Sequence, residues 1–345
     1  MGKIMNSRER IKTIIAGGEP DRCGFWLGNP DPATWPILHK YFGTETQEQL
    51  RLKLKDDFRW ICPQWDLDCY KDPQGKPMFD LGLSENKKSL GQPGPFADTK
   101  NISEIEDYRW PDAKYLDFSG WNEKIKRYEG FYIASGFWTC FYHNLMDMFG
   151  MESYLVNMFL NKELLHYVTD KVCQFYYDAN EKFFDAAGNT IDAFFFGNDF
   201  GTQLDLICGL EQFDEFILPW FRKFTEQAHR RGYQTILHSC GSVFKVIDRL
   251  IDMETDCLHP LQAKAANMNA EKLAKHFKGK IAFLGGIDTQ DLLVNGTADE
   301  VKQDVLRVKK AFGSFIISPS HEAVLPNVPP ENIEAMAEVS LRELT

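Results

Sequence analysis

The sequence predicts a (β/α)8 barrel, the closed α/β fold in which helices surround eight parallel strands. Eight short apolar runs alternate along the chain with amphipathic stretches, and each run ends in polar or glycine residues. Near-continuous apolar runs separated by helices are typical of a parallel sheet that is buried on both faces. The length of 345 residues suits either two average domains or one large barrel of this kind. Neither GxGxxG nor GxxxxGK(S/T) follows the first run, so a nucleotide-binding open sheet is not favoured.

The first elements are expected in the following order. Residues 1–20 carry charges throughout and are expected to form a helix that lies across the barrel. The runs GFWLG and FRWICPQ predict strands at 24–28 and 58–64. From about 65 to 112 the chain is rich in Pro, Gly, Lys and Asp, which predicts an insertion or lid with its own short hairpin. Residues 1–345 are otherwise expected to form a single barrel domain.

The other six strands are expected to alternate with helices. The runs FYIASGFW, AFFFGND, TILHSCG, CLHPLQ, IAFLGGID and FIISPSH predict strands at 131–138, 193–199, 235–241, 257–262, 281–288 and 315–321. Apolar residues at helical spacing predict helices at 162–187, 211–231, 243–253, 269–277 and 298–312. The regular alternation over this part of the chain is the reason for preferring a closed barrel to an open sheet.

Charge and composition exclude some classes of partner. The net charge of −11 argues against nucleic acid or an anionic membrane surface, because both require clustered Lys and Arg. No apolar run approaches the ~18 residues that a membrane span requires. Eight cysteines without CxxC pairs, and a first segment without a signal-like apolar run, lead us to expect a reduced, cytoplasmic protein. The 27 Phe and 8 Trp suit either an apolar pocket or a large core.

Polar side chains gather at the carboxyl ends of the expected strands. Barrels of this type carry their chemistry at that end. The residues in question are Asn29, Asp31, Gln64, Trp138, Asn198, Asp199, His238, Cys240, His259, Gln262, Asp288, His321 and Glu322. This set suits metal binding and acid–base chemistry.

The sharpest pattern is His238-Ser239-Cys240, at the end of the expected fifth strand. Residues two apart on a strand point to the same side, so the imidazole and the thiolate can converge on one ion. That pair of donors favours zinc, which requires at least a third protein ligand. His321, at the end of the eighth strand, is the best candidate for it. A chance pairing of a core histidine with a buried cysteine is the alternative interpretation.

Two carboxylates at strand ends have two interpretations each. Asp199, within GNDFGTQ, suits a general base, a metal ligand or a group that orients a ligating imidazole. Asn, Asp and Gly are also favoured in caps and turns, so a purely structural role fits equally well. Asp288, after two glycines, has the same pair of interpretations. His259, which precedes Pro260, is expected to be structural.

Five stretches carry a family resemblance that spans nearly the whole chain. They are RERIKTIIAGGEPDR, GNDFGTQ, HSCGSVFKVIDRLIDMETDCLHPLQ, LGGIDTQDLLVNGT and ISPSHEAVLPNVPPENIEAM. Together and in this order they resemble the uroporphyrinogen decarboxylase superfamily, specifically its branch of zinc-dependent corrinoid methyltransferases. The resemblance implies a TIM barrel, in agreement with the eight runs. The decarboxylases carry an MRQAGR-like motif where residues 25–30 here read FWLGNP without arginine, so porphyrinogen decarboxylation is not expected.

The resemblance also implies a ligand set. His238 and Cys240 match the His-x-Cys ligands of the methyltransferase branch, whose third ligand is a cysteine in an SPGC-like stretch. This chain has SPSH, which places His321 there. Zinc with one thiolate and two imidazoles has a formal charge of 2 − 1 = +1, whereas two thiolates leave it neutral. The more positive ion is the stronger Lewis acid toward an ether or phenol oxygen.

These implications lead to a functional hypothesis. Zinc polarises the oxygen of a small O-methylated substrate, and the methyl group moves between that substrate and the cobalt of a corrinoid. The chain has no DxHxxG motif, so the corrinoid is expected on a separate partner protein. Asp199 and Glu322 are the expected catalytic residues, which orient the zinc or its ligands. The expected substrate contacts are Trp26, Asn29, Trp138, Phe196, Asn198, Gln262 and Asp288.

Three other activities stay open at this point. The same site can activate a thiol that accepts a methyl group from a methylcorrinoid protein. A metal-free decarboxylase or lyase, with Asp199 as the acid, is a second alternative. The third is a barrel that only binds a corrinoid or another small ligand. The sequence sets neither the substrate nor the number of subunits, and it is compatible with a homo-oligomer.

Overall fold

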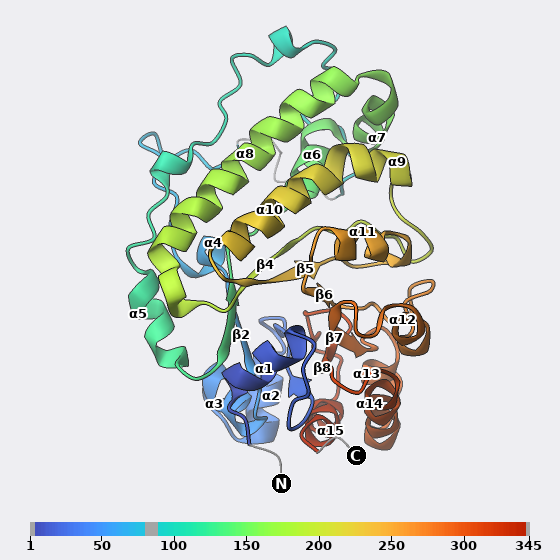
Figure 1. The fold of residues 1–345 in the computed structure, drawn as a ribbon. Coiled ribbons are helices and arrows are strands. Elements are labelled where there is room, and N and C mark those ends of the chain that lie inside the picture. The colour runs from blue at the N-terminus through green and yellow to red at the C-terminus, as the bar shows by residue number, and fades with distance from the viewer. Residues whose placement is uncertain (1–3, 80–88, 343–345) are drawn as a thin grey trace.

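Eight parallel strands form one sheet that is curled into a barrel, with helices around it (Figure 1). The computed structural model describes residues 4–79 and 89–342. Neighbouring strands follow the order β1-β8-β7-β6-β5-β4-β3-β2. The strands are β1 Gly24–Phe25, β2 Phe58–Ile61, β3 Tyr132–Ser135, β4 Ala193–Gly197, β5 Gln234–His238, β6 Cys257–His259, β7 Ala282–Ile287 and β8 Ile316–Pro319. The predicted (β/α)8 barrel is confirmed, and each strand lies within its predicted run or one residue before it.

Each predicted amphipathic stretch is helical in the structure, and further helices lie between them. The bounds of α8 (Lys162–Ala187) and α14 (Ala298–Phe312) are those predicted. The predicted helix at 211–231 is divided into α9 (Leu210–Gln212), a π-helical turn (Phe213–Ile217) and α10 (Leu218–Arg230). The others are α1 Ser7–Ile15, α2 Trp35–Phe42, α3 Gln47–Lys53, α4 Pro63–Asp66, α5 Trp121–Ile125, α6 Phe141–Phe149, α7 Met151–Leu160, α11 Ile247–Asp252, α12 Ala270–Phe277, α13 Leu292–Asn295 and α15 Pro330–Ser340. None of the described helices has the length and apolarity that crossing a membrane requires.

Helix α1 is the predicted helix before the first strand, and it packs against the barrel interior. Asn6 caps it by accepting the Glu9 N–H at 2.8 Å. Its buried face carries Ile11, Ile14 and Ile15, which belong to the same apolar cluster as the inward side chains of the strands. Burial of such a face contributes most of the stability of a short helix. Helix α1 therefore helps to close the interior of the barrel.

Alternation along the strands decides which aromatic rings enter the barrel. On β4, Phe195 points into the interior cluster, where it packs against Trp26. Its neighbours Phe194 and Phe196 point outward and stack on each other, with ring centroids 4.6 Å apart and planes at 4°. Phe196 also packs on Phe221 of α10. The prediction that Phe196 lines a substrate slot is therefore wrong, because the register of β4 gives that position to Phe195.

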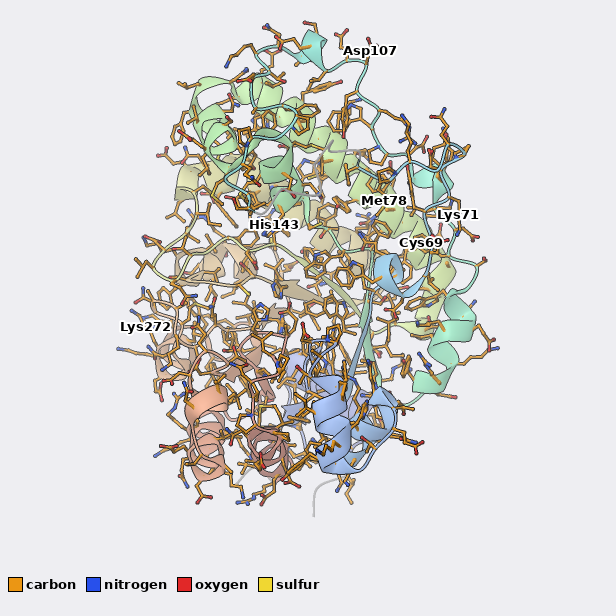
Figure 2. All side chains as sticks on the ribbon, turned by 180° about the vertical axis from the view of Figure 1, so that it is seen from behind. Cys69, Lys71, Met78, Asp107, His143 and Lys272 are labelled. Carbon is orange, nitrogen blue, oxygen red and sulfur yellow. The ribbon has the colours of Figure 1, made fainter. Side chains whose placement is uncertain are left out.

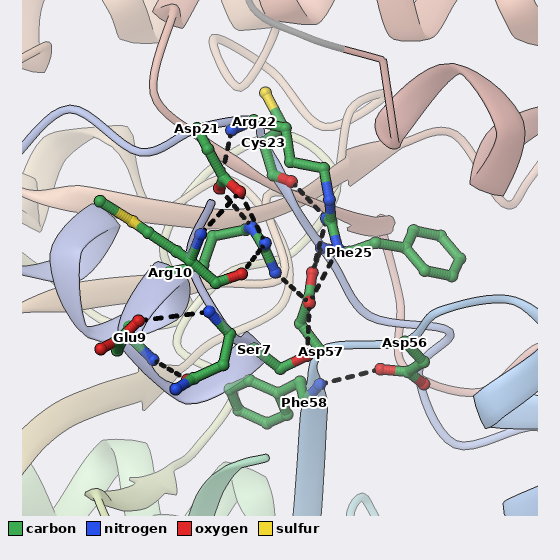
Figure 3. A network of polar contacts seen from close by, with 12 residues as sticks. Ser7, Glu9, Arg10, Asp21, Arg22, Cys23, Phe25, Asp56, Asp57 and Phe58 are labelled. Carbon is green, nitrogen blue, oxygen red and sulfur yellow. Dashed lines mark hydrogen bonds and ion pairs between the residues drawn. The ribbon is translucent and has the colours of Figure 1, made fainter. Parts of the chain in front are cut away.

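The barrel closes between β1 and β2 with the help of carboxylate side chains (Figure 3). The Asp57 N–H donates to the carbonyl oxygen of Phe25 at 2.9 Å. The carboxylate of Asp57 accepts the Phe25 N–H at 3.0 Å, and the carboxylate of Asp56 accepts the Leu27 N–H at 3.2 Å. These side chains replace backbone carbonyls that a regular ladder would supply. We call residues 24–27 and 56–58 the seam.

Arginines neutralise the two carboxylates of the seam, which are both fully buried. Arg10 donates to Oδ1 of Asp57 at 2.8 Å, and Arg22 donates to Oδ2 at 2.8 Å. Arg51 donates to Asp56 at 2.6 Å. Buried carboxylates persist in folded proteins only when they are paired and hydrogen-bonded in this way.

The segment 65–112, expected to be an insertion or lid, leaves the barrel after α4. Tyr70 forms an antiparallel bridge with Leu116, which ties the base of the segment together. The described part of the segment contains one 3-10 turn, at Ile102–Glu104, and no hairpin. Residues 80–88, the other part of the segment in which the hairpin was expected, lie outside the described residues.

Beyond its base, this segment packs on the helices of one side of the molecule. The Phe96 N–H donates to the carbonyl oxygen of Met148, the penultimate residue of α6, at 2.7 Å. Figure 2 labels two residues of the segment, Cys69 at mid-height on one side of the molecule and Asp107 at the top. The described part of the segment thus adds a layer over α6, α7 and α8.

A partly buried ion pair joins the end of α10 to the start of β5 and β6. Nε2 of His229 lies 2.8 Å from the carboxylate of Asp256, which also accepts the Thr235 N–H at 2.7 Å. The hydrogen bond to Asp256 raises the pKa of His229 above its ordinary value of 6.5. The folded protein therefore holds this proton more tightly than the unfolded chain does.

The stability contributed by His229 is expected to depend on pH. It is complete below about pH 6.5 and is lost as the pH rises through the raised pKa of the folded state. His229→Gln should lower the urea midpoint more at about pH 6 than at about pH 9. His276→Gln is the control, because His276 bonds only to the backbone carbonyl of Lys272 among the described contacts. An effect of His229→Gln that is equal at both pH values would contradict this expectation.

Candidate metal centre

Three side chains from neighbouring strands converge at the carboxyl end of the barrel. His238 ends β5, Cys240 lies two residues further in the same loop, and Asp199 follows β4. Nε2 of His238 lies 3.2 Å from Oδ1 of Asp199 and 3.6 Å from Sγ of Cys240. The three ligand atoms all lie within 4.8 Å of one another. The geometry brings together the predicted His-x-Cys pair and the predicted Asp199.

These distances fit the edges of a tetrahedral zinc site. Zinc bonds nitrogen and oxygen at about 2.0–2.1 Å and thiolate sulfur at about 2.3 Å. At tetrahedral angles those bonds separate a nitrogen from an oxygen by about 3.3 Å and a nitrogen from a sulfur by about 3.6 Å. The observed 3.2 and 3.6 Å agree with both values. One imidazole, one thiolate and one carboxylate also form a donor set that zinc accepts.

Two glycines allow the ligand loops to meet. Gly201, two residues after Asp199, lies against Gly241, and a Cβ on Gly241 would come within 2.3 Å of the Gly201 carbonyl. The Cys240 N–H donates to Oδ1 of Asp199 at 2.9 Å, which holds the carboxylate beside the thiol. The side-chain oxygen of Gln262 accepts the Gly241 N–H at 2.7 Å. Gln262, which was expected to contact substrate, thus supports the loop that carries Cys240.

His321, the predicted third ligand, lies beside this group rather than within it. Among the described residues, two groups of ligand atoms converge, one from Asp199, His238 and Cys240 and one from His238, His259 and Glu322, and His321 belongs to neither. The neighbouring Cys240 is the main cause that raises the pKa of His321. Nδ1 of His321 accepts the Ala323 N–H at 3.1 Å, which leaves Nε2 as the nitrogen available to the thiol.

Glu322 reaches the site from the same loop after β8. Its Oε2 lies 3.6 Å from Nδ1 of His321 and 3.8 Å from Nδ1 of His238, and it has no hydrogen-bond partner among the described residues. The main chain of Glu322 is fixed by the Asn29 N–H, which donates to its carbonyl at 2.7 Å. Gly28, with φ +80°, permits this approach, because a Cβ there would lie 2.5 Å from that carbonyl oxygen.

A second histidine, His259, contacts the back of His238. The two residues face each other across β5 and β6, and their Nδ1 atoms are 2.9 Å apart. His259 is fully buried, and its Nε2 has no hydrogen-bond partner among the described residues. Trp26, also fully buried, packs on its ring at 5.3 Å. Trp26 therefore lies below the site, under His259, instead of lining an open slot.

The charges around the site shift the pKa values of His238 and His259 in opposite directions. Burial acts to lower the pKa of His238, but Glu322, Cys240 and the hydrogen bond to Asp199 raise it well above the ordinary value. Burial lowers the pKa of His259 well below that value, and the neighbouring His238 lowers it further. Burial acts to raise the pKa of Asp199, but the hydrogen bond with His238 outweighs it and holds the pKa of this carboxyl well below its ordinary range. The two shifts run in opposite directions, so a positive charge is more favourable on His238 than on His259.

An aromatic wall of Trp60, Trp65 and Trp138 borders the candidate site. The ring of Trp138 lies 5.6 Å from that of His238, in an edge-on contact. Trp60 packs on both Trp138 and Trp65 at 5.4 Å. Trp65 is 63% exposed, so the wall reaches the surface. Only Trp138 was predicted; Trp60 shares the inward face of β2 with Phe58, and that alternation could have identified it.

Asn198 was expected to contact substrate, but its polar atoms are used within the fold. Its side-chain oxygen accepts the Tyr142 N–H at 3.0 Å, and its NH2 group donates to the carbonyl of Thr139 at 2.8 Å. It is 1% exposed. Asn198 holds the start of α6 against β4, so the prediction of a substrate contact is corrected to a structural role.

Asp288 and Asn29 are also held by the protein. The carboxylate of Asp288 accepts the N–H groups of Gln290 and Leu292 at 3.0 and 3.1 Å, as a turn-forming aspartate does. It is 5% exposed. The side-chain oxygen of Asn29 lies 3.3 Å from Arg51. For Asp288, the structural interpretation given by the sequence is thus the one that the contacts favour.

His143 is a residue of the site that sequence reasoning missed. Its Nε2 lies 3.9 Å from Oδ2 of Asp199, and its Nδ1 lies 3.4 Å from the side-chain oxygen of Asn198 (Figure 2 labels its position). His143 belongs to the first turn of α6. A rule that inspects only strand ends does not reach it.

Comparisons with known proteins place the chain in a family. The family model of uroporphyrinogen decarboxylase (URO-D) matches residues 126–342, which is more than half of the chain. No curated protein matches the sequence. A solved structure of a methyltransferase from Methanosarcina mazei is similar in fold, with a TM-score of 0.65 and 14% sequence identity, over 97% of this chain and 98% of that one. The chain belongs to the uroporphyrinogen decarboxylase (URO-D) family.

Proposed function

We propose that the protein moves a methyl group between a small O-methylated substrate and the cobalt of a corrinoid carried by a partner protein. The observation that carries this proposal is the convergence of Asp199, His238 and Cys240 at zinc-like distances beside the aromatic wall. The His-x-Cys motif and the fold shared with a methyltransferase from Methanosarcina mazei support it.

Each group of the site has a separate part in this reaction. Asp199, His238 and Cys240 would hold zinc, which when bound supplies Lewis-acid activation of the substrate oxygen. The aromatic wall takes the apolar part of the substrate, since flat rings around a few polar groups are typical of small-molecule sites. Glu322 supplies negative charge beside His238 and His321. The exposed ring of Trp65 marks the side from which substrate and corrinoid would approach.

The donor set favours an oxygen substrate over a thiol. With Asp199 as the third ligand the formal charge of the zinc site is 2 − 1 − 1 = 0, instead of the +1 expected with His321. The site nevertheless contains a single thiolate, and carboxylate and imidazole are harder donors than a second thiolate would be. A harder zinc site binds and polarises oxygen more readily than sulfur.

The test is a methyl-transfer assay with the zinc-loaded protein. We expect it to methylate a Co(I) corrinoid in the presence of at least one member of a panel of methoxylated compounds, as followed by the corrinoid absorption spectrum. His238→Ala should abolish the reaction. His39→Ala should leave it unchanged, because His39 lies on the outer helix α2 and its Nδ1 contacts Thr44. Methyl loss from a methylcorrinoid that requires a thiol would show the reverse reaction instead. No change with either reagent, or activity in His238→Ala, would overturn the proposal.

A further inference from the structure

We infer that His259 is a positioning residue, which accepts the Nδ1–H of His238 and thereby fixes the tautomer in which Nε2 of His238 faces Asp199 and Cys240. This inference rests on the proposed zinc site. His259 is not one of the three donors Asp199, His238 and Cys240; its Nδ1 contacts Nδ1 of His238, and with Glu322 these two histidines form a second group of converging atoms. From the sequence, His259 was expected to be structural only.

The distances define the hydrogen bond. A neutral imidazole carries its proton on one nitrogen, and the nitrogen that binds a metal must be unprotonated. Nε2 of His238 is the atom that faces Asp199 and Cys240, so its proton must be on Nδ1 when metal is bound. Nδ1 of His238 lies 2.9 Å from Nδ1 of His259 and 3.8 Å from Oε2 of Glu322. Only the first distance is that of a hydrogen bond.

The surroundings of His259 suit an acceptor. Its ring is fully buried between Trp26, at 5.3 Å, and Phe195, at 5.2 Å. Such apolar packing opposes a positive charge on the ring. The other ring nitrogen, Nε2, has no hydrogen-bond partner among the described residues. The contact of Nδ1 with His238 is thus the only hydrogen bond that the His259 ring makes among the described residues.

A neutral acceptor has a chemical consequence. Ligating histidines usually donate to a carboxylate or a backbone carbonyl, and a carboxylate raises the basicity of the imidazole. An imidazole acceptor orients His238 without adding a negative charge behind it. The zinc site would keep more of its Lewis acidity, in keeping with an oxygen substrate.

Two substitutions at one position separate this role from packing. His259→Leu keeps a buried apolar side chain but removes the acceptor. His259→Asn keeps an acceptor, because its side-chain oxygen occupies about the place of Nδ1. In competition titrations with a chromophoric chelator, we expect His259→Leu to bind zinc roughly 10–100-fold more weakly than the unsubstituted protein. His259→Asn should recover most of the affinity, and the Co(II) absorption spectrum should return with it.

A second measurement does not depend on the variants being folded. In zinc-loaded protein with 15N-labelled histidine, NMR should show His259 protonated at Nε2 and unprotonated at Nδ1. A proton on Nδ1 of His259, or equal zinc affinity in His259→Leu and the unsubstituted protein, would overturn the inference and leave the proposed function standing. If the unsubstituted protein itself binds no zinc, the proposed function fails, and this inference fails with it.

Discussion

Replacing Cys240 with serine is expected to weaken zinc binding by more than about 100-fold and to abolish methyl transfer. This loss of affinity is larger than the roughly 10–100-fold loss that follows removal of a residue that only orients a ligand. The serine hydroxyl is not ionised at neutral pH, whereas the thiolate is the softest and most strongly bonding donor of the three ligands. The substitution changes the side chain by a single atom, and the Cys240 N–H can still donate to Asp199. The effect therefore isolates the loss of sulfur from any change in the loop.

Zinc content after dialysis, followed by competition titration, measures this effect. Cys208→Ser is the matched control, because Cys208 is also half-buried and lies in the chain after β4. It should retain zinc and activity. Stoichiometric, tightly bound zinc in Cys240→Ser would contradict the assignment of Cys240 as a ligand.

The second large effect is expected at the seam of the barrel. Asp57→Asn should lower the free energy of unfolding by about 3–5 kcal/mol, the usual result of breaking a buried ion pair by removing one partner. Oδ1 of Asp57 accepts from Arg10, Arg22 and Ser7, and all three distances lie between 2.8 and 3.0 Å. An amide removes the charge and turns one acceptor into a donor that faces two guanidinium groups. The substitution leaves these two arginines without their buried counter-charge.

Urea unfolding of the metal-free protein, followed by tryptophan fluorescence, measures the change in stability. Asp205→Asn serves as the control, since Asp205 pairs with Lys245 and both side chains are about half exposed. Such a surface pair contributes about 1 kcal/mol or less. A loss in Asp57→Asn as small as that in Asp205→Asn would show that the seam is not held by this carboxylate.

The fold could be read from the sequence because its signals are local. Each strand is a short apolar run, and the helices α8 and α14 end where their apolar periodicity ends. The seam could not be predicted in this way. It depends on Asp56 and Asp57 reaching a strand more than twenty residues away, and nothing in their immediate surroundings distinguishes them from surface aspartates.

The candidate site was predictable in part, for a related reason. The alternation of strand residues brought His238 and Cys240 to one side, and their loop meets Asp199 because β4 and β5 are neighbours. The role of His259 depends on its register with His238 across β5 and β6, which one sequence does not reveal. The place of His321 depends on the path of the loop after β8. That path turned Nδ1 toward the backbone and left Asp199 as the third converging donor.

The seam also shows that the barrel is closed by two kinds of interaction, backbone pairing and specific side-chain contacts. Backbone pairing between strands uses amides that every residue but proline carries, so it tolerates almost any exchange of side chains. Closure at the seam depends instead on the identities of particular acidic and basic residues. The other seven junctions around this barrel are ladders of backbone hydrogen bonds between neighbouring strands, whereas β1 and β2 are joined largely through side chains. The seam is therefore the natural place to cut or permute this barrel. A half-barrel from another protein would complete this junction only if it carried the matching charged residues.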